Sequence, residues 1–350
     1  MKEFDINKLV RENIRKLLPY SSARSEFSGK ASVFLDANEN SFGSASDGKY
    51  NRYPDPLQKE LKQKISELKS IPAKNIFLGN GSDEAIDLLI RAFCEPRKDN
   101  IIVFPPTYGM YEVASTINDV EIREVPLNTE FQINIQGVLD KIDALTKLIF
   151  ICSPNNPTGN LMQDSDIQIL LNKFNGIVVL DEAYIDFAQR ESWLKRLRQF
   201  SNLVILQTFS KAWGLAGLRI GMAFASEEII NILNKIKPPY NIGEATQQLT
   251  INALEQSEKV GEWVKAIVTE RISLINQLSQ FSFIEKIYET DANFLMVKVT
   301  DANNLYAFLI QNGIAVRNRS NIILCENCLR ITVGTTSEND SLISTLKNYR

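Results

Sequence analysis

Short apolar runs alternate with longer helical patterns through the first two thirds of the chain. Helical patterns such as 83–93 and 164–174 separate several of these runs. The runs are rich in Ile, Val, Leu and Phe and are expected as strands at 75–78, 101–104, 148–152, 177–180, 203–206 and 221–224. Strands that are apolar along their whole length and alternate with helices are typical of a mainly parallel sheet covered on both faces. The sequence therefore predicts an α/β fold.

The pattern changes after Pro238 and Pro239, where a smaller α/β region begins. Residues 244–281 carry apolar side chains at spacings of three and four and are expected to be helical. Strands are expected after them at 294–299, 314–316 and 329–333, and helices at 303–312 and 339–349. A chain of 350 residues can fold as two domains. We expect an N-terminal arm (1–30), a large domain (31–242) whose first residues can pack on the small one, and a connecting helix with a small domain (243–350).

Composition excludes several functional classes. The net charge of −3 gives no sign of a nucleic-acid partner or an anionic membrane. No apolar run approaches the ~18 residues that a spanning helix needs. The N-terminus lacks the apolar core of a signal peptide, and Glu3, Asp5 and Glu12 argue against an organellar transit peptide. The expected compartment is the cytoplasm. A short amphipathic helix is expected near the N-terminus, with Ile6, Val10, Ile14 and Leu17 on its apolar face.

The chain contains no histidine, which excludes Ser-His-Asp and Cys-His catalysis and all His-ligated metal sites. Acid–base chemistry must therefore use Lys, Tyr, Asp or Glu. Cys325 and Cys328 form one Cys-x-x-Cys without a second pair, so a zinc site is not expected. Two thiols in a hairpin turn are the favoured interpretation, because nothing nearby resembles a thioredoxin-like unit.

Lys211 follows the apolar run 203–206 in a turn rich in Gly and Ser. Ligands of α/β sheets collect at the carboxyl ends of strands, and lysine forms Schiff bases with aldehyde cofactors. Ser210 and Arg219 add a hydroxyl and a fixed positive charge, which suit a phosphate. A solvated loop lysine is the alternative when this motif is taken alone.

Other expected strands also end in polar motifs. Residues 79–85 open a helix whose free N–H groups can hold a phosphate, but Glu84 breaks the Gly-x-Gly-x-x-Gly dinucleotide pattern. Tyr108 can stack on a flat ring or simply pack within its turn. Asn156 can present a rigidly held amide to a ligand, or it can only help to form the turn. Asp181 ends a buried strand, where a carboxylate needs a charged partner such as a protonated pyridine nitrogen or a structural cation. Tyr184 lies three residues beyond it and can bond a phenolic oxygen on the same ring.

The order of these motifs resembles the fold-type I pyridoxal-phosphate aminotransferases, class II subfamily. The motifs are residues 53–56 (Tyr-Pro-Asp-Pro), 79–84 (Gly-Asn-Gly-Ser-Asp-Glu), 153–159 (Ser-Pro-Asn-Asn-Pro-Thr-Gly), 181–184 (Asp-Glu-Ala-Tyr) and 210–211 (Ser-Lys). Segments 19–24, 35–40, 52–56 and 329–334 narrow the resemblance to the histidinol-phosphate aminotransferases, over nearly the whole chain. One departure is Ser41, where these enzymes usually have proline. The resemblance implies a large domain with a seven-stranded, mainly parallel sheet.

The resemblance also implies a role for each residue of a pyridoxal 5'-phosphate site. Lys211 would be linked to the cofactor aldehyde and would move the proton between substrate and cofactor carbons. Asp181 would pair with the pyridine nitrogen. Asn156 and Tyr184 would bond the ring hydroxyl oxygen, and Tyr108 would stack on the ring. The cofactor phosphate would be held by Ser82, Asp83 (through its backbone), Ser210, Arg219 and, in a homodimer, Tyr53 of the partner subunit, on which the N-terminal arm would also pack.

Substrate binding is implied less directly. Arg330 matches the arginine that binds the substrate carboxylate in these enzymes, and a guanidinium fork can bind either a carboxylate or a phosphate. Further expected contacts are Tyr20, Arg24, Asn38 and Arg317, although solvated surface charge explains Arg24 and Arg317 nearly as well.

The implied reaction is transamination between L-histidinol phosphate and 2-oxoglutarate, giving imidazole-acetol phosphate and L-glutamate in histidine biosynthesis. Two alternatives use the same scaffold: an aromatic amino-acid aminotransferase and a phosphothreonine-type decarboxylase. A non-catalytic cofactor-binding regulator would need an attached DNA-binding domain, for which we expect no room before Tyr53.

Overall fold

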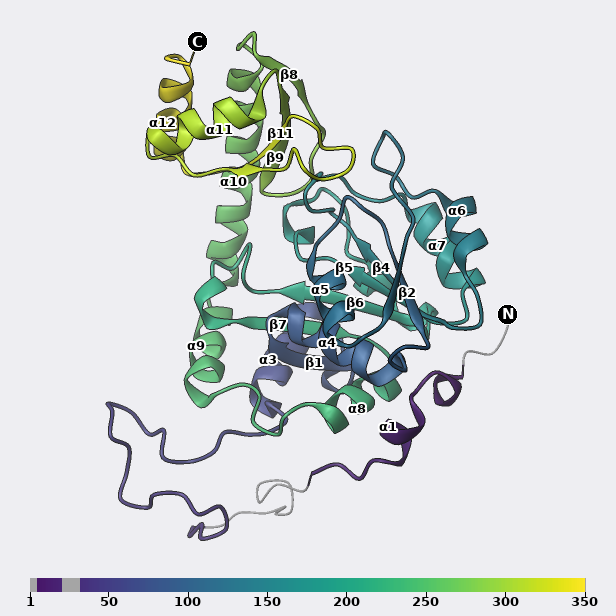
Figure 1. Ribbon diagram of the computed structural model, residues 1–350. Helices are drawn as coiled ribbons and strands as arrows, with labels where there is room; N and C mark the ends of the chain where they lie inside the picture. Colours follow the sequence, from purple (N-terminus) through teal and green to yellow (C-terminus); the bar gives the residue numbers. More distant parts are fainter. Residues whose placement is uncertain (1–4, 21–31, 350) are drawn as a thin grey trace.

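The computed structural model describes residues 5–20 and 32–349. Within them, a seven-stranded sheet has the spatial order β1-β7-β6-β5-β4-β2-β3 (Figure 1). Only β7 pairs antiparallel with its neighbours, so the predicted mainly parallel α/β sheet is confirmed. The strands are β1 (Ile76–Asn80), β2 (Asn100–Val103), β3 (Glu121–Glu124), β4 (Thr146–Cys152), β5 (Ile177–Asp181), β6 (Leu203–Thr208) and β7 (Ile220–Phe224).

Helices cover both faces of this sheet, because its central strands are apolar on both sides. In β5, Val178 and Leu180 belong to one buried cluster, whereas Ile177 and Val179 belong to the other. The second cluster is completed by α4 (Ser82–Phe93), α5 (Met110–Ile117) and α8 (Glu227–Ile236). The first is completed by α3 (Lys59–Lys69), α6 (Ile135–Lys141), α7 (Asp164–Lys173) and the 3-10 helix η4 (Trp193–Gln199).

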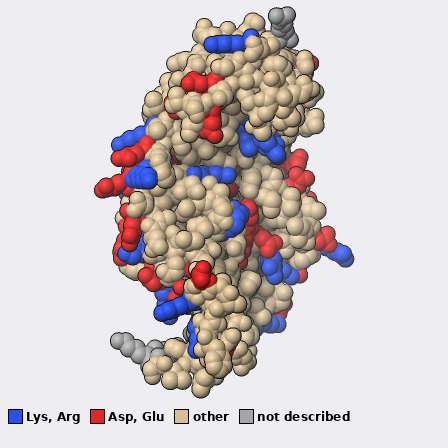
Figure 2. All heavy atoms as spheres, turned by 90° about the vertical axis from the view of Figure 1, so that its left-hand side faces the viewer, with Lys and Arg blue, Asp and Glu red and all other residues tan. Residues whose placement is uncertain are grey.

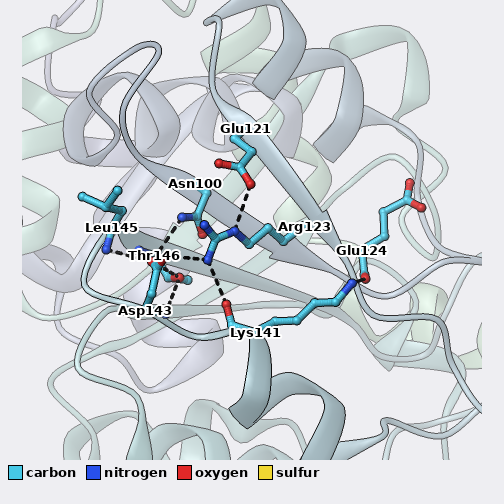
Figure 3. Close-up of polar contacts among 8 residues, drawn as sticks. All are labelled: Asn100, Glu121, Arg123, Glu124, Lys141, Asp143, Leu145 and Thr146. Carbon is cyan, nitrogen blue, oxygen red and sulfur yellow. Dashed lines mark hydrogen bonds and ion pairs between the residues drawn. The ribbon is translucent and has the colours of Figure 1, made fainter.

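The edge strand β3 was not predicted, because its sequence Glu-Ile-Arg-Glu is polar. A charged network holds it in place (Figure 3). Arg123 contacts Glu121 at 3.0 Å and Asp143 at 2.7 Å, and the bond from Arg123 holds the pKa of Asp143 well below its usual range. Charged residues on an edge strand also discourage pairing with another chain. The side chain of Glu124 points away from this network.

A second, antiparallel sheet has the order β10-β11-β9-β8. Its elements are β8 (Ile284–Ile287), β9 (Phe294–Val299), β10 (Arg317–Asn318), β11 (Cys328–Thr332), α11 (Ala302–Gln311) and α12 (Thr336–Leu346). The strand expected at 314–316 is wrong, because pairing begins only at Arg317. Ile314 and Val316 pack against the apolar cluster of this sheet without joining it. Their apolar side chains therefore indicated burial, not backbone pairing.

Two helical predictions also need correction. Residues 244–281 form two helices, α9 (Glu244–Leu254) and α10 (Ser257–Leu278), because the backbone of Gln256 leaves the helical region. Near the N-terminus, a 3-10 turn (Ile6–Lys8) and a short α1 (Glu12–Lys16) replace the single amphipathic helix. Arg11 between them bonds Glu95 at 3.1 Å, so this stretch packs on its own chain.

The molecular surface has mixed charge. On the face in Figure 2, acidic and basic side chains are interspersed without a large region of one sign. Among the described residues, no helix has both the length and the apolar character needed to cross a membrane. Cys325 and Cys328 are buried free thiols, of which Cys325 precedes β11 and Cys328 begins it. Burial raises the pKa of both thiols, to about 12 and about 11, which disfavours the reactive thiolate.

Candidate active site

Most of the expected cofactor residues gather at one edge of the large sheet, where parallel strands end. Eight of them line one cavity, called here the lysine cavity. Lys211 follows β6, Asp181 ends the adjacent β5, and Ser82 begins α4 after β1. The predicted residues that line this cavity are Ser82, Asp83, Tyr108, Asp181, Tyr184, Ser210, Lys211 and Arg219.

Asp181 lies at the floor of the lysine cavity and is almost fully buried. Its carboxylate accepts bonds from the Tyr111 hydroxyl at 2.8 Å and the Ala183 backbone N–H at 3.1 Å. Burial raises the pKa of Asp181 to about 6, and the bond from Tyr111 opposes that shift. A carboxylate has about four acceptor positions, so it can take a further donor from the cavity.

Tyr111 was missed by the sequence analysis. It is fully buried and stacks on Phe150 of β4, with ring centroids 4.8 Å apart. Its sequence signal was weak, because it follows the Tyr108 turn and looks like an ordinary apolar position of α5. Only the packing of α5 against β4 and β5 brings its hydroxyl to Asp181.

The raised pKa of Asp181 predicts a pH effect on the stability of the cofactor-free protein. The folded carboxyl binds a proton more tightly than the unfolded one, so Asp181 makes stability fall as pH rises from about 4 to about 6. Asp181→Asn cannot ionise and should remove this component. Thermal unfolding of both proteins across that range measures it. The comparison with Asp181→Asn is needed because burial also raises the pKa of Glu182, to about 7. Glu182 therefore also makes stability fall as pH rises. Parallel stability curves for the two proteins would contradict the prediction.

An anion cradle forms the other end of the lysine cavity. The N-cap of α4 is Gly81, which supplies no side-chain cap and leaves the first N–H groups open to a ligand. Arg219 approaches the start of α4 from the turn before β7. Its Nη1 lies 3.5 Å from the Ser210 hydroxyl, and its Nη2 lies 3.5 Å from the Asp83 carboxylate. A Cβ on Gly81, whose φ is +75°, would lie 2.7 Å from Arg219 Nη2. The positive φ favours glycine here, and a Cβ would also displace the end of the Arg219 side chain.

The space between Asp181 and the cradle is flanked by aromatic rings. Tyr108 donates its hydroxyl to Asp83 at 3.0 Å and packs edge-on against Tyr111. The Lys211 amine lies 5.4 Å from the centre of the Tyr184 ring. Burial, followed by the charge of Arg330, lowers the pKa of Lys211, which favours the neutral amine that a nucleophile needs.

A second hollow, called here the arginine cavity, adjoins the first and shares Tyr108, Tyr184 and Lys211 with it. Strands β10 and β11 and the residues after β10 contribute its arginines: Arg317, Arg319 and Arg330. Asn156 lines this cavity, and its side-chain oxygen accepts a bond from Arg330 at 2.5 Å. The structure thus brings Arg317, Arg330 and Asn156 to the predicted lysine, and adds Arg319, which the sequence analysis did not single out.

Other expected residues lie apart from these cavities. Tyr20 is largely exposed and lines neither. Asn38 and Tyr53 line a separate hollow beside the start of α9, where Tyr53 stacks on Tyr240 with centroids 4.5 Å apart. Arg24 lies outside the described residues. Within one chain, Tyr20, Asn38 and Tyr53 are therefore not assembled with Lys211.

A lysine after a central strand, an aspartate ending the adjacent strand and an anion cradle at a helix start define the site of a fold-type I pyridoxal-phosphate enzyme. Residues 26–346 match the family model described as aminotransferase class I and II. The chain belongs to this family, as the sequence motifs indicated. Two curated relatives named histidinol-phosphate aminotransferase come from Cytophaga hutchinsonii (51% identical) and Christiangramia forsetii (53% identical), and each alignment covers 99% of both chains.

Solved structures agree with this fold. The histidinol-phosphate aminotransferase from Clostridium acetobutylicum superposes with a TM-score of 0.79 at 25% identity, covering 85% of this chain and 90% of that one. A histidinol-phosphate aminotransferase from Sinorhizobium meliloti, solved in complex with pyridoxal-5'-phosphate, gives a TM-score of 0.78 at 22% identity, covering 96% of each chain. Because its sequence identity is only 22%, the Sinorhizobium meliloti structure supports the fold alone.

Pyridoxal 5'-phosphate is the cofactor of this family, as the sequence analysis expected. The lysine cavity fits its chemistry. The open start of α4 with Ser210 and Arg219 suits its phosphate, and Asp181 retains acceptor capacity for its ring nitrogen. Lys211 supplies the amine that its aldehyde requires.

Proposed function

We propose that the protein transfers the amino group between L-histidinol phosphate and 2-oxoglutarate, giving imidazole-acetol phosphate and L-glutamate in histidine biosynthesis. The observation that carries the proposal is the arginine cavity, which places Arg317 and Arg330 next to Lys211. The substrate needs a site for its phosphate beside the reactive amine, and guanidinium groups suit that anion. The names of the full-length relatives support the same substrate.

In this proposal, bound pyridoxal phosphate supplies an aldehyde and an electron-withdrawing ring. Lys211 would hold the cofactor and, once released, would move the proton at the substrate carbon, for which its lowered pKa suits it. Asp181 would keep the ring nitrogen protonated, and Tyr111 holds that carboxylate in position. Asn156 and Tyr184 would bond the ring hydroxyl oxygen, and Tyr108 would stack on the ring. The cofactor phosphate would be held by Ser82, the backbone of Asp83, Ser210 and Arg219.

The two substrates present different anions at the same place. Glutamate has a carboxylate and histidinol phosphate has a phosphate, and the fork of Arg330 can bond either. Arg317 serves the phosphate, with Tyr20 and Arg24 as further proposed contacts. Asn38 is proposed as a further substrate contact. Arg330 is held by its bond to Asn156 and lies over the Phe294 ring at 5.2 Å.

Arg330→Ala should damage both half-reactions, because both anions lose the same fork. Arg317→Ala should weaken histidinol phosphate more than glutamate, since a divalent phosphate can engage several cations together. Single-turnover measurements of each half-reaction report the losses as differences in kcat/KM. Equal losses for both substrates in Arg317→Ala would remove Arg317 from the phosphate site.

The substrate assignment is tested on the wild-type enzyme. L-Histidinol phosphate, L-phenylalanine and L-phosphothreonine are compared in parallel with 2-oxoglutarate as the amino acceptor. We expect histidinol phosphate to be the best amino donor. A better rate with phenylalanine would assign the protein to the aromatic aminotransferases. Release of carbon dioxide from phosphothreonine would assign it to the decarboxylases on this scaffold.

We also propose that the protein is a cytoplasmic homodimer. Each chain would consist of an N-terminal arm (1–30), a large domain (31–242) and a connecting helix with a small domain (243–350). Residues 32–50 loop away from the body (Figure 1) and expose Val33, Leu35 and Phe42, the first two by 68% and 84%. Exposed apolar side chains on an extended segment suit an interface. In the proposed dimer this segment packs on the second copy, and Tyr53 of the partner subunit reaches the cofactor phosphate. Residues 5–16 pack on their own chain, so the proposed contact begins after them.

A further inference from the structure

Arg319 carries a buried group that lacks a partner. Its Nε is inaccessible to solvent and forms no hydrogen bond within the described part of the chain. Buried polar atoms in folded proteins are nearly always bonded, so the guanidinium group of Arg319 is not fully satisfied by the chain alone. Arg319 also lines the arginine cavity next to Lys211, where a bound anion would meet its guanidinium group.

The backbone explains why three arginines face one cavity. Arg317 of β10 pairs with Arg330 of β11, and residues opposite each other in an antiparallel pair project to the same face. Arg319 lies two positions after Arg317, and its N–H bonds the carbonyl of Cys328 at 2.9 Å, so the pairing continues to it. Alternate residues of an extended segment share a face. Asn318 between them donates instead to Asn303 at 2.8 Å.

This arrangement is electrostatically unfavourable without an anion. Like charges directly opposite each other destabilise a strand pair. Burial lowers the pKa of Arg319, and the charges of Arg330 and Arg317 lower it further. Within residues 5–20 and 32–349, none of the three arginines forms an ion pair with a carboxylate, although Glu112 and Glu124 also line the cavity. An anion of high charge between the guanidinium groups would offset the repulsion.

We propose that Arg319 binds the phosphate of the substrate and makes the enzyme favour a phosphate over a carboxylate. The inference rests on the proposed function and deepens it. A phosphate presents three acceptor oxygens and up to two negative charges, whereas a carboxylate presents two oxygens and one charge. Arg330 alone can serve either anion. Arg319 adds donors that only the larger, divalent anion engages at the same time as Arg317 and Arg330.

The test compares Arg319→Gln, Arg319→Lys and the control Lys298→Gln. Lys298 lies on β9 of the same sheet, pairs with Glu285 at 3.9 Å and does not line the cavity. Calorimetric titration of each cofactor-loaded protein with inorganic phosphate measures anion affinity without turnover. The loaded form is used so that the cofactor occupies its own phosphate cradle. Half-reactions with L-histidinol phosphate, L-histidinol and L-glutamate are then followed by the cofactor absorbance.

Arg319→Gln should weaken phosphate binding by roughly tenfold to a hundredfold, the range for a lost charge-assisted bond. It should lower kcat/KM for histidinol phosphate by a similar factor, mainly through KM, while changing L-histidinol and L-glutamate much less. Arg319→Lys should restore part of the affinity, and Lys298→Gln should match the wild type.

Two results would overturn the inference. One is unchanged phosphate affinity in Arg319→Gln. The other is an equal loss for all three amino donors, without recovery in Arg319→Lys, which would assign Arg319 a purely structural role. The proposed function fails differently: wild-type enzyme would then fail to prefer L-histidinol phosphate over L-histidinol, whatever the phosphate titration of Arg319→Gln shows.

Discussion

Lys211→Ala is expected to abolish transamination and the visible absorbance of the lysine-bound cofactor. The substitution removes the ε-amino group, which is both the covalent attachment and the proton carrier in the proposed reaction. Arg219, Ser210 and the start of α4 remain, so the protein should still bind pyridoxal phosphate reversibly. Steady-state rates with L-histidinol phosphate and absorbance spectra of the purified protein measure the two losses.

Lys173→Ala provides the matched control, because this lysine ends α7 on the exposed surface and lines neither cavity. It should retain wild-type activity and spectrum. Turnover of Lys211→Ala at the wild-type rate would disprove the entire assignment of the site, since no other amine lines the lysine cavity among the described residues.

Asp181→Asn should bind the cofactor but lose at least tenfold in rate. The neutral amide no longer stabilises a protonated ring nitrogen, and one lost charge-assisted bond is worth ~1.5–3 kcal/mol. Because Asp181 is buried, water cannot replace the lost charge. Single-turnover rates at saturating L-histidinol phosphate measure the chemical step, and cofactor titration checks that binding survives.

Asp119→Asn is the control for this change, since Asp119 forms an exposed ion pair with Arg97 far from the cavities. Exposed pairs contribute little, so its activity should be normal. Unchanged turnover in Asp181→Asn would mean that Asp181 has a structural role and that its bond from Tyr111 serves only to satisfy a buried carboxylate.

The apolar runs of the large domain predicted its strands closely, and the polar residue after each run predicted the site. Lys211 after β6, Asp181 at the end of β5 and Ser82 after β1 could be placed together from local sequence alone. The reason is general: parallel strands all end at one edge of a sheet, so residues that follow them converge whatever their separation in the chain. The polar strand β3 could not be predicted from local sequence, because its place in the sheet depends on pairing with β2, which is distant in the chain.

The sequence by itself determined the fold class, the family and the lysine and aspartate proposed as catalytic, because these depend on patterns within short segments. Only the tertiary structure decided what surrounds them. Tyr111 reaches Asp181 through helix packing, and Arg319 joins Arg330 through the pairing beside β10 and β11. Such contacts join residues far apart in the chain, across elements whose side chains could face either way. Their partners therefore follow from the three-dimensional packing and cannot be read from any one segment.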